Sequence, residues 1–459
     1  MKEVRVLGSD AFARVSVVLL PLAMGGVCGV QGAEGERAAP EESAVDEGVS
    51  AAVRERPPLG WLSDPKQEPA DIFEALVGGK LHLNNRFRIE LADTTGRDSS
   101  TAITNRIRLG YETKPYYGFS GMIEMENVAS PDRDNYFVPA TGAGSPRRTP
   151  VADPTGTEVN QAYGRFAASS LGDTGISLDV RGGRQRILLD DERFVGNVGW
   201  RQFEQTFDSV SARTNFGVDG LSVFYAYVWE VKRIFGPDGD DPRSDSHLLN
   251  VSYRLAPELT VTAFGYLLDF RDDEPLNSTD TYGVRLTGLL GDHEREEGAL
   301  TFGYELSYAR QVDAGSNPVD FAADFFAVEG KVQRAGLGWL SIGYQFLGSD
   351  DGDFGFRFPL GTNHKFQGFA DQFLVTPADG LQDLYVAVGT ELAWGIKPMV
   401  AFHQFYTDQG GEDLGWELDF AVSKQITPQW SVLLKGAYFD GHSGQPDTTR
   451  FWIQTEFRF

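Results

Sequence analysis

From about residue 80 to the C-terminus, apolar and polar residues alternate along most of the chain. The final segment, FWIQTEFRF, shows the pattern clearly. From Phe451 to Phe459 every second residue is aromatic, aliphatic or threonine. Glu456 and Arg458 lie in the other phase, in which Trp452 is the exception. Successive side chains leave a strand on opposite faces, so a period of two predicts strands with one apolar and one polar face. Because helical periodicity is nearly absent after residue 80, the sequence predicts an all-β protein.

Turn-forming clusters of Gly, Pro, Asp and Asn divide this region into about 18 strands of roughly ten residues, the length that a tilted membrane-spanning strand needs. The predicted strands start near residues 81, 102, 118, 157, 175, 204, 221, 246, 258, 279, 299, 321, 338, 382, 396, 413, 428 and 449. Short connections such as 114–118 alternate with longer ones such as 129–156 and 348–380. This alternation is typical of an up-and-down antiparallel sheet with one rim of tight turns and one of long loops.

The two faces of such a sheet need different surroundings. Arg and Glu are dense on the polar face, and no helices are predicted to cover the apolar face. A secreted β-sandwich or propeller, the alternative fold, would bury its apolar faces and leave the charges outside. Closing the sheet into a transmembrane up-and-down antiparallel β-barrel, with its apolar face in lipid, satisfies both faces and removes the edges. The last strand must then pair with the first, near 81–92. Both chain ends fall on the short-turn rim, which is periplasmic in barrels of the bacterial outer membrane.

The N-terminal part of the chain has a different character. Residues 1–33 are typical of a secretory signal peptide, with Lys2, Arg5 and Arg14 ahead of an apolar stretch of the usual length. Residues 34–79 are charged, rich in Pro and poor in large apolar residues, which predicts a flexible periplasmic lead-in. Residues 80–459 form the predicted outer-membrane barrel.

Composition excludes several kinds of site. The formal net charge of −25 argues against nucleic-acid binding, because phosphate would be repelled. Cys28 is the single cysteine and lies in the predicted signal, where lipid attachment is the alternative to simple cleavage. A mature chain without cysteine has no disulfide, thiolate metal site or cysteine nucleophile. The histidines show no metal-ligand spacing, so no cofactor is expected; a Ca²⁺ site at Asp350, Asp351 and Asp353 is the alternative to a solvated acidic rim.

The polar face predicts the lining of an aqueous lumen, because a barrel of this size stays open unless something plugs it. By strand phase, the predicted lumen-facing arginines are Arg86, Arg88, Arg106, Arg108, Arg184, Arg186, Arg213, Arg254, Arg285 and Arg458. The glutamates on the same face are Glu90, Glu112, Glu124, Glu126, Glu305, Glu417 and Glu456. Two interpretations stay open and are compatible: Arg–carboxylate ladders that brace the wall, or a constriction where arginines exceed their partners and draw anions through.

Three blocks carry a more specific resemblance. The first contains Gly183, Arg184, Gln185, Arg193, Gly196, Trp200, Arg201, Gln202, Phe207 and Asp208; the second spans 358–386 and the third 403–419. Together they resemble the alginate export family of outer-membrane porins. The resemblance implies a channel for an acidic polysaccharide or its oligomers, with outer-membrane lipid as surroundings. The C-terminal aromatic strand similarly resembles the signal read by the barrel-assembly machinery. A general or other-anion-selective porin is the alternative function.

The loops and histidines leave further alternatives. The connection that holds Arg193 and Arg201 is polar and predicts either an inward-folded constriction or an ordinary extracellular loop. The aromatic residues of 354–373 suit either stacking on sugar rings or a packed lid over the barrel mouth. A barrel hydrolase would need a Ser–His–carboxylate set, and His247 and His403 have no evident serine partner. We therefore expect a channel and not an enzyme.

Overall fold

The computed structural model describes residues 69–271, 273–291 and 298–459. The predicted signal peptide at 1–33, the lipid-attachment alternative at Cys28 and most of the predicted lead-in lie outside these residues. Within the described ranges, no helix is long and apolar enough to cross a bilayer.

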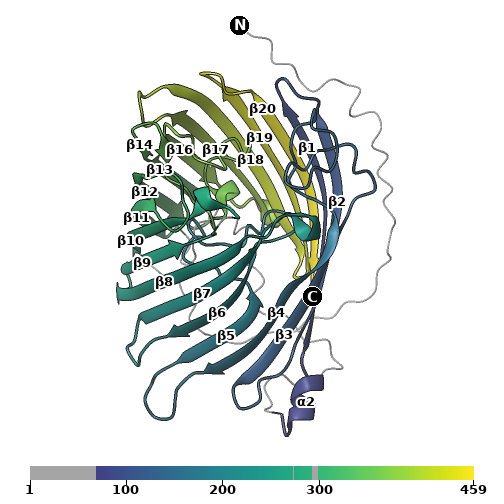
Figure 1. The fold of residues 1–459 in the computed structure, drawn as a ribbon, viewed down its shortest axis with the longest axis vertical. Helices are drawn as coiled ribbons and strands as arrows, with labels where there is room; N and C mark the ends of the chain where they lie inside the picture. The colour runs from purple at the N-terminus through teal and green to yellow at the C-terminus, as the bar shows by residue number, and fades with distance from the viewer. Residues whose placement is uncertain (1–68, 272, 292–297) are drawn as a thin grey trace. The chain divides into compact units, whose positions relative to one another are not determined.

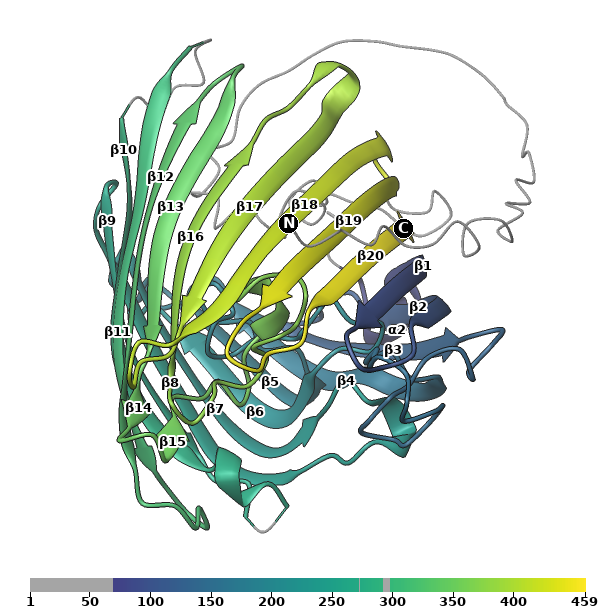
Figure 2. The same ribbon diagram turned by 90° about the horizontal axis from the view of Figure 1, so that it is seen from above.

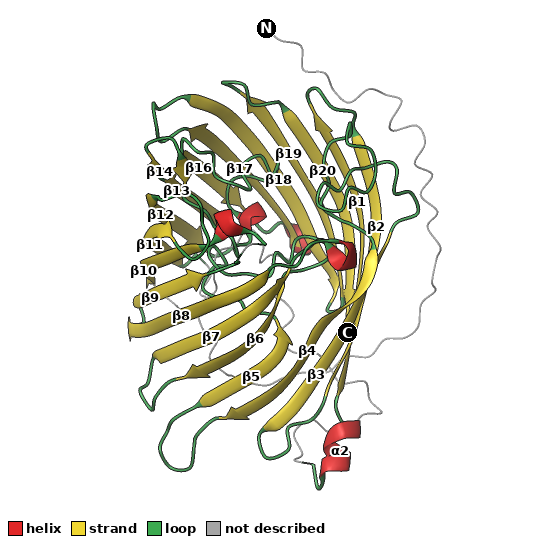
Figure 3. Cartoon of the chain, in the orientation of Figure 1, coloured by secondary structure: helices red, strands yellow, loops and turns green. Residues whose placement is uncertain are grey.

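The described chain is built almost entirely from strands (Figures 1 and 3). The barrel strands are β1 (Lys80–Thr94), β2 (Ser100–Glu112), β3 (Phe119–Ala129), β4 (Gly156–Ala168), β5 (Leu178–Gln185), β6 (Thr206–Thr214), β7 (Leu221–Lys232), β8 (Arg243–Ala256), β9 (Leu259–Leu268), β10 (Thr279–Gly291), β11 (Leu300–Asp313), β12 (Ala322–Arg334), β13 (Gly338–Leu347), β16 (Leu381–Gly389), β17 (Ile396–Tyr406), β18 (Asp413–Thr427), β19 (Trp430–Gly441) and β20 (Thr448–Arg458). Each predicted start lies within three residues of an observed one.

These strands form one closed antiparallel meander of 18 strands. Each strand pairs with the next along the chain, and β1 also pairs with β20, from Asn84 opposite Arg458 to Thr94 opposite Thr448. The predicted closure of the last strand on the first is therefore confirmed, and Figure 2 shows β20 beside β1. β13 pairs with β16 because β14 (Ser349–Asp350) and β15 (Phe354–Gly355) form a separate small hairpin inside the connection between them.

The burial pattern along the strands follows the predicted phase. On β2, Ile107 and Leu109 are 43% and 50% exposed, whereas Arg106 and Arg108, which alternate with them, are buried. Exposed apolar and buried charged side chains mean that the apolar face points out to lipid and the charged face into the barrel. Among the described residues, short helical segments are η2 (Gly236–Asp238), η3 (Pro275–Asn277), η4 (Asn363–Lys365) and η5 (Ala393–Gly395), besides α2 (Ile72–Val77).

The last part of the predicted lead-in is structured. Helix α2 spans Ile72–Val77, and Asp71 caps its first turn by accepting a hydrogen bond from the Glu74 amide at 2.8 Å. Gly78 ends the helix, and its amide donates to the Glu74 carbonyl. The expectation of a flexible segment through residue 79 thus does not hold for α2, whose few residues are too short a window for helical periodicity to register.

Candidate functional site

Two long connections lie against the inner wall and against each other. The first inward loop is 186–205, between β5 and β6, and the second is 348–380, between β13 and β16. Val195 and Leu360 form a parallel bridge between the loops. The Gly196 amide and the Gln205 side-chain amide both donate to the Leu360 carbonyl, at 2.9 and 3.0 Å. Of the two alternatives for the first loop, the structure has the inward-folded one.

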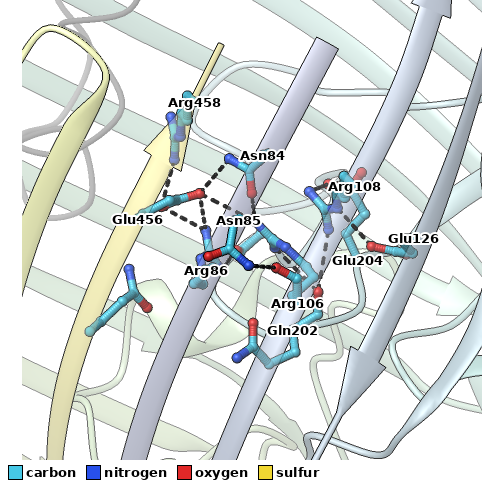
Figure 4. Close-up of polar contacts among 12 residues, drawn as sticks. Asn84, Asn85, Arg86, Arg106, Arg108, Glu126, Gln202, Glu204, Glu456 and Arg458 are labelled. Atoms are coloured by element: carbon cyan, nitrogen blue, oxygen red, sulfur yellow. Dashed lines mark hydrogen bonds and ion pairs between the residues drawn. The ribbon is translucent and has the colours of Figure 1, made fainter. Parts of the chain in front are cut away.

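Arginines of β1 and β2 hold the first inward loop through its backbone. Arg86 Nη1 donates to the Gly199 carbonyl at 2.9 Å, and Arg88 Nη2 donates to the Trp200 carbonyl at 2.5 Å. Arg106 Nη1 donates to the Gln202 carbonyl at 3.2 Å (Figure 4). A guanidinium group carries five N–H donors and no acceptor, so it suits a turn whose carbonyl groups have no partner within the turn.

Buried carboxylates neutralise part of this cationic wall. Glu456 of β20 accepts from Arg458 at 3.0 Å, from Arg106 at 3.2 Å and from Arg86 at 3.4 Å (Figure 4). Arg108 pairs with Glu126 of β3 at 2.7 Å and with Glu204 of the first inward loop at 3.3 Å. These pairs link β20, β1, β2 and β3 through their inward-facing side chains.

Glu204 ties the first inward loop to a second group of arginines. Its carboxylate contacts Arg186 and lies 2.8 Å from the Asn197 side-chain amide. Burial by itself would raise the pKa of Glu204, but Arg108 and Arg186 lower it to about 2. Glu204 is therefore ionised throughout the physiological pH range, and its ion pairs hold the C-terminal end of the first inward loop.

A chain of ion pairs joins the two inward loops to the wall. Arg201 of the first loop pairs with Glu90 of β1 at 3.4 Å and contacts Asp371 of the second loop. Glu90 also pairs with Arg450 of β20 at 2.8 Å, and Arg450 Nε donates to the Ala370 carbonyl at 2.9 Å. Although burial opposes ionisation of Asp371, His364 and Arg201 hold the pKa of its carboxyl well below the usual range.

An aromatic cage encloses a buried lysine next to this chain. Lys435 of β19 lies 2.8 Å from His364 Nε2, and its ammonium sits 3.9 Å from the Trp200 ring centre and 3.5 Å from that of Phe369. Trp452 packs edge-on against Trp200 with ring centres 5.6 Å apart. The one aromatic residue that breaks the alternation of the last strand thus faces inward to contact a loop. Sequence reasoning did not identify Lys435 or Arg450, although both lie in the inward phase.

The other predicted site residues are distributed around the wall. Arg184 pairs with Asp208 at 2.8 Å, and Arg186 pairs with Glu124 at 2.7 Å. Arg285 pairs with Glu305 at 2.7 Å and with Asp191 at 3.4 Å. Arg213 donates to Ser222 Oγ at 2.9 Å, and Glu112 lies 3.5 Å from His82. Arg254 is exposed near the end of β8. Arg193 donates to Gln367 Oε1 at 2.7 Å and lies over the rings of Phe358 and Phe366. The structure therefore gathers the arginines of β20, β1 and β2, but not Arg213, Arg254 and Arg285, into one cluster.

The aromatic residues of the second inward loop pack against one another and the wall. Phe356 and Phe358 contact Phe325 of β12 and Phe194 of the first loop, with ring centres 5.1–6.3 Å apart. Phe354, Phe369 and Phe373 are also buried, whereas Phe366 is half-buried. Most of these rings hold the loops together and do not offer free faces to a sugar.

A cavity of about 80 Å³ lies beside the second loop on the wall formed by β11 to β17. Its lining includes Glu305, Glu329, Ser341, Tyr385 and His403. Since one water molecule needs about 10–15 Å³ of such volume, the cavity accommodates several waters. Polar groups and room for water make this wall part of a wet interior.

Neither histidine that the sequence singled out belongs to a catalytic arrangement. His403 faces inward and pairs with Asp383 at 3.0 Å, while His247 lies 2.8 Å from the Tyr225 hydroxyl. Neither has a serine as hydrogen-bond partner in the contacts seen here. Across the described ranges, no three His, Cys, Asp or Glu side chains cluster in a way that could hold a metal ion. Asp350, one of the Ca²⁺ candidates, accepts a hydrogen bond from the Ala322 amide at 3.3 Å.

Known proteins place this barrel in a family. The family model described as alginate export matches residues 84–339. The chain belongs to the alginate export family. No curated protein matches it.

Solved barrels share the fold at low sequence identity. OpdL of Pseudomonas aeruginosa is 16% identical with a TM-score of 0.60, over 84% of this chain and 100% of that one. OccAB2 of Acinetobacter baumannii is 15% identical with a TM-score of 0.63, over 84% and 99% of the two chains. OccK9 (OpdG) of P. aeruginosa is 12% identical with a TM-score of 0.64, over 84% and 100%. Family and fold together identify this alginate export family protein as an outer-membrane β-barrel channel and not an enzyme.

Proposed function

We propose that the channel passes hydrophilic anionic solutes and that its substrates are acidic polysaccharides or their oligomers. The observation that carries the proposal is the charge of the inward face on three neighbouring strands. β20, β1 and β2 place six arginines on that face: Arg86, Arg88, Arg106, Arg108, Arg450 and Arg458. The same face of these strands holds three glutamates, Glu90, Glu112 and Glu456, so arginines outnumber glutamates there by three (6 − 3). Asp153, Glu126 and Glu204 of neighbouring segments pair with Arg88 and Arg108 and reduce this excess.

The arginines also retain unused hydrogen-bonding capacity. Nε of Arg86 and Nε of Arg106 are buried and have no hydrogen-bond partner among the described residues. Such donors are expensive to leave unsatisfied, so a buried water molecule is their natural partner. Arginine binds carboxylates through charge-assisted hydrogen bonds, which favours uronate groups over neutral sugars.

The large negative charge of the whole protein does not oppose this proposal. Acidic stretches such as 238–241 and 349–353 lie in connections of the long-loop rim, away from Arg458 at the other end of β20. In physiological salt, electrostatic interactions across water are screened over about 8 Å. The acidic rim therefore acts only weakly on a solute near Arg458.

A general or other-anion-selective porin is the second candidate. The observation that favours it is that Arg86, Arg88 and Arg106 donate hydrogen bonds to carbonyl groups of the first inward loop. Those donors are not free to bind a polymer. In that case the arginines brace the constriction, and the ion selectivity of the channel arises only from their electrostatic field. A small anion would then pass, but an oligouronate would gain no specific binding.

Block of single-channel current distinguishes the two candidates. Oligouronates and neutral oligosaccharides of equal length are added to the channel in planar bilayers. The proposal predicts concentration-dependent block by the oligouronate at concentrations where the neutral sugar has no effect. Equal block by both sugars, or by neither, would contradict a uronate substrate and leave the general porin.

Arg458 offers a substitution that spares the inward loops. Its side chain is 20% exposed and its ion pair is with Glu456, not with a loop. Arg458→Gln should weaken oligouronate block several-fold, whereas Arg310→Gln, at an exposed pair with Asp324, should leave it unchanged. Equal block in wild type and Arg458→Gln would remove Arg458 from the pathway.

A further inference from the structure

Helix α2 presents an apolar surface that the barrel does not cover. Of its six residues, Ile72, Phe73, Leu76 and Val77 are exposed, Phe73 by 70%. Ala75 is the one residue of the helix that is buried. Single exposed apolar residues are common on proteins, but four large ones within less than two helical turns form a patch that calls for a partner.

The attachment of α2 shows on which side of the barrel this patch lies. Tyr111 near the end of β2 is in the same strand phase as Ile107 and Leu109, the exposed residues of the lipid-facing wall. Its hydroxyl donates to the Leu76 carbonyl at 2.7 Å and accepts from the Gly79 amide at 2.8 Å. An outward-pointing side chain thus holds the helix, so α2 lies at the outer side of the rim and does not project into the lumen.

The level of α2 along the barrel is the short-turn rim. The Lys114 amide, in the turn between β2 and β3, donates to the Ala75 carbonyl at 3.0 Å. Figure 3 shows α2 in red at the end of β1 and β2 from which the chain enters the barrel. The C-terminal end of β2 and the start of β1 therefore lie between the helix and the rest of the barrel.

Aromatic residues surround this position on the outer face. Tyr117 and Phe119 of the adjoining turn and strand are exposed. Phe119 packs against Phe166 of β4, with ring centres 4.9 Å apart. Aromatic side chains are enriched where a barrel crosses from hydrocarbon to head groups. The apolar patch of α2 therefore lies at the same rim as the aromatic edge of the lipid-facing wall.

We propose that α2 is an interfacial helix, with Ile72, Phe73, Leu76 and Val77 inserted into the lipid leaflet at the short-turn rim. Phospholipid is the partner of the patch, because the patch lies at the edge of a surface that faces lipid. A helix lying in the plane of the membrane buries its apolar face at the boundary between head groups and acyl chains.

The polar residues of α2 are compatible with this position. The Asp71 carboxylate caps the Glu74 amide at 2.8 Å, and the Glu74 carboxylate accepts from the Ala70 amide at 2.9 Å. Both carboxylates thereby accept from backbone amides at the start of the helix, which have no preceding helical carbonyl as a partner. They remain exposed or half-buried and can stay among hydrated head groups while the apolar face enters the lipid.

Site-specific quenching tests the proposal on the full chain. Cysteine replaces Phe73, Leu109 or Ala140 in a Cys28→Ser background, and an environment-sensitive fluorophore is attached after reconstitution into phosphatidylcholine vesicles. Leu109 is the lipid-facing reference, and Ala140 is an exposed residue of the long-loop rim that serves as the aqueous reference. Heat-modifiable migration in gels confirms that each variant is folded.

The label at Phe73 should behave like the label at Leu109. Lipids carrying a nitroxide on the acyl chain should quench both at least twofold and spare the label at Ala140, while aqueous iodide should do the reverse. Iodide quenching at Phe73 equal to that at Ala140 would overturn the proposal. Protection of Phe73 from both quenchers would also overturn it, because protein would then cover the patch.

Discussion

Replacing Arg88 by Met should release the first inward loop from the wall. Arg88 is completely buried; it donates to Gln454 at 2.7 Å and Asp153 at 3.2 Å, and to the Trp200 carbonyl. The loop itself loses the charged hydrogen bond at the Trp200 carbonyl, and such a bond contributes about 1.5–3 kcal/mol. Since each 1.4 kcal/mol or so is tenfold in an equilibrium constant, the population of detached loop should rise by about one to two orders of magnitude.

Planar-bilayer recording measures this effect directly. A detached loop widens the path and fluctuates, so Arg88→Met should show a higher and noisier open-channel current than wild type. Arg310→Met is the matched control: Arg310 and Asp324 are about half exposed, and such surface pairs contribute about 0–1 kcal/mol. Identical conductance and noise in wild type and a folded Arg88→Met barrel would refute the idea that this arginine holds the constriction.

Three further predictions follow from the loops, the rims and the C-terminus. Burial lowers the pKa of His364 to about 4 from 6.5, so protonation of His364 favours the unpacked second loop. Channel noise should therefore be lowest above about pH 6.5 and rise as the pH falls toward 4. His364→Gln should remove that pH dependence. In whole cells, an impermeant maleimide should label Ala140→Cys on the long-loop rim and not Ser169→Cys on the short-turn rim; the reverse pattern would invert the topology. Deleting Phe459, which pairs with Leu83 through two backbone hydrogen bonds of 2.8 and 3.1 Å, should lower the amount of heat-modifiable barrel in the outer membrane, and an unchanged amount would contradict its role in assembly.

The barrel was predictable because its physical requirement repeats in every strand. A strand with lipid on one side and water on the other must alternate, and the turn residues between strands mark its ends. The small hairpin of β14 and β15 and the helix α2 escaped prediction for the opposite reason. Each is too short for a period to appear, and each is held by contacts with distant segments, such as Tyr111 with Leu76.

Of the candidate site, only the residues of the barrel wall could be predicted from the sequence. Strand phase placed Arg86, Arg88 and Arg106 on the inner face, and they are there. Their partners were not predictable, because a backbone carbonyl such as that of Gly199 or Trp200 carries no sequence signal. Ion pairs such as that between Arg201 and Asp371 join residues 170 positions apart within irregular loops, where no periodicity fixes the direction of a side chain.

Two residues of the wall did carry a signal. Trp452 interrupts the alternation of the final strand, and Lys435 is the only charged residue in the inward phase of WSVLLKGAYF. Both residues contact an inward loop, Trp452 at Trp200 and Lys435 at His364.

The reversal potential of the wild-type channel in a KCl gradient tests the central claim most directly. The local surplus of arginines on β20, β1 and β2 predicts chloride selectivity in spite of the net charge of −25. Arg106→Gln with Arg108→Gln should shift the reversal potential toward potassium. A wild-type channel that already prefers potassium, with no shift in the double variant, would contradict the account and reduce these arginines to braces of the wall.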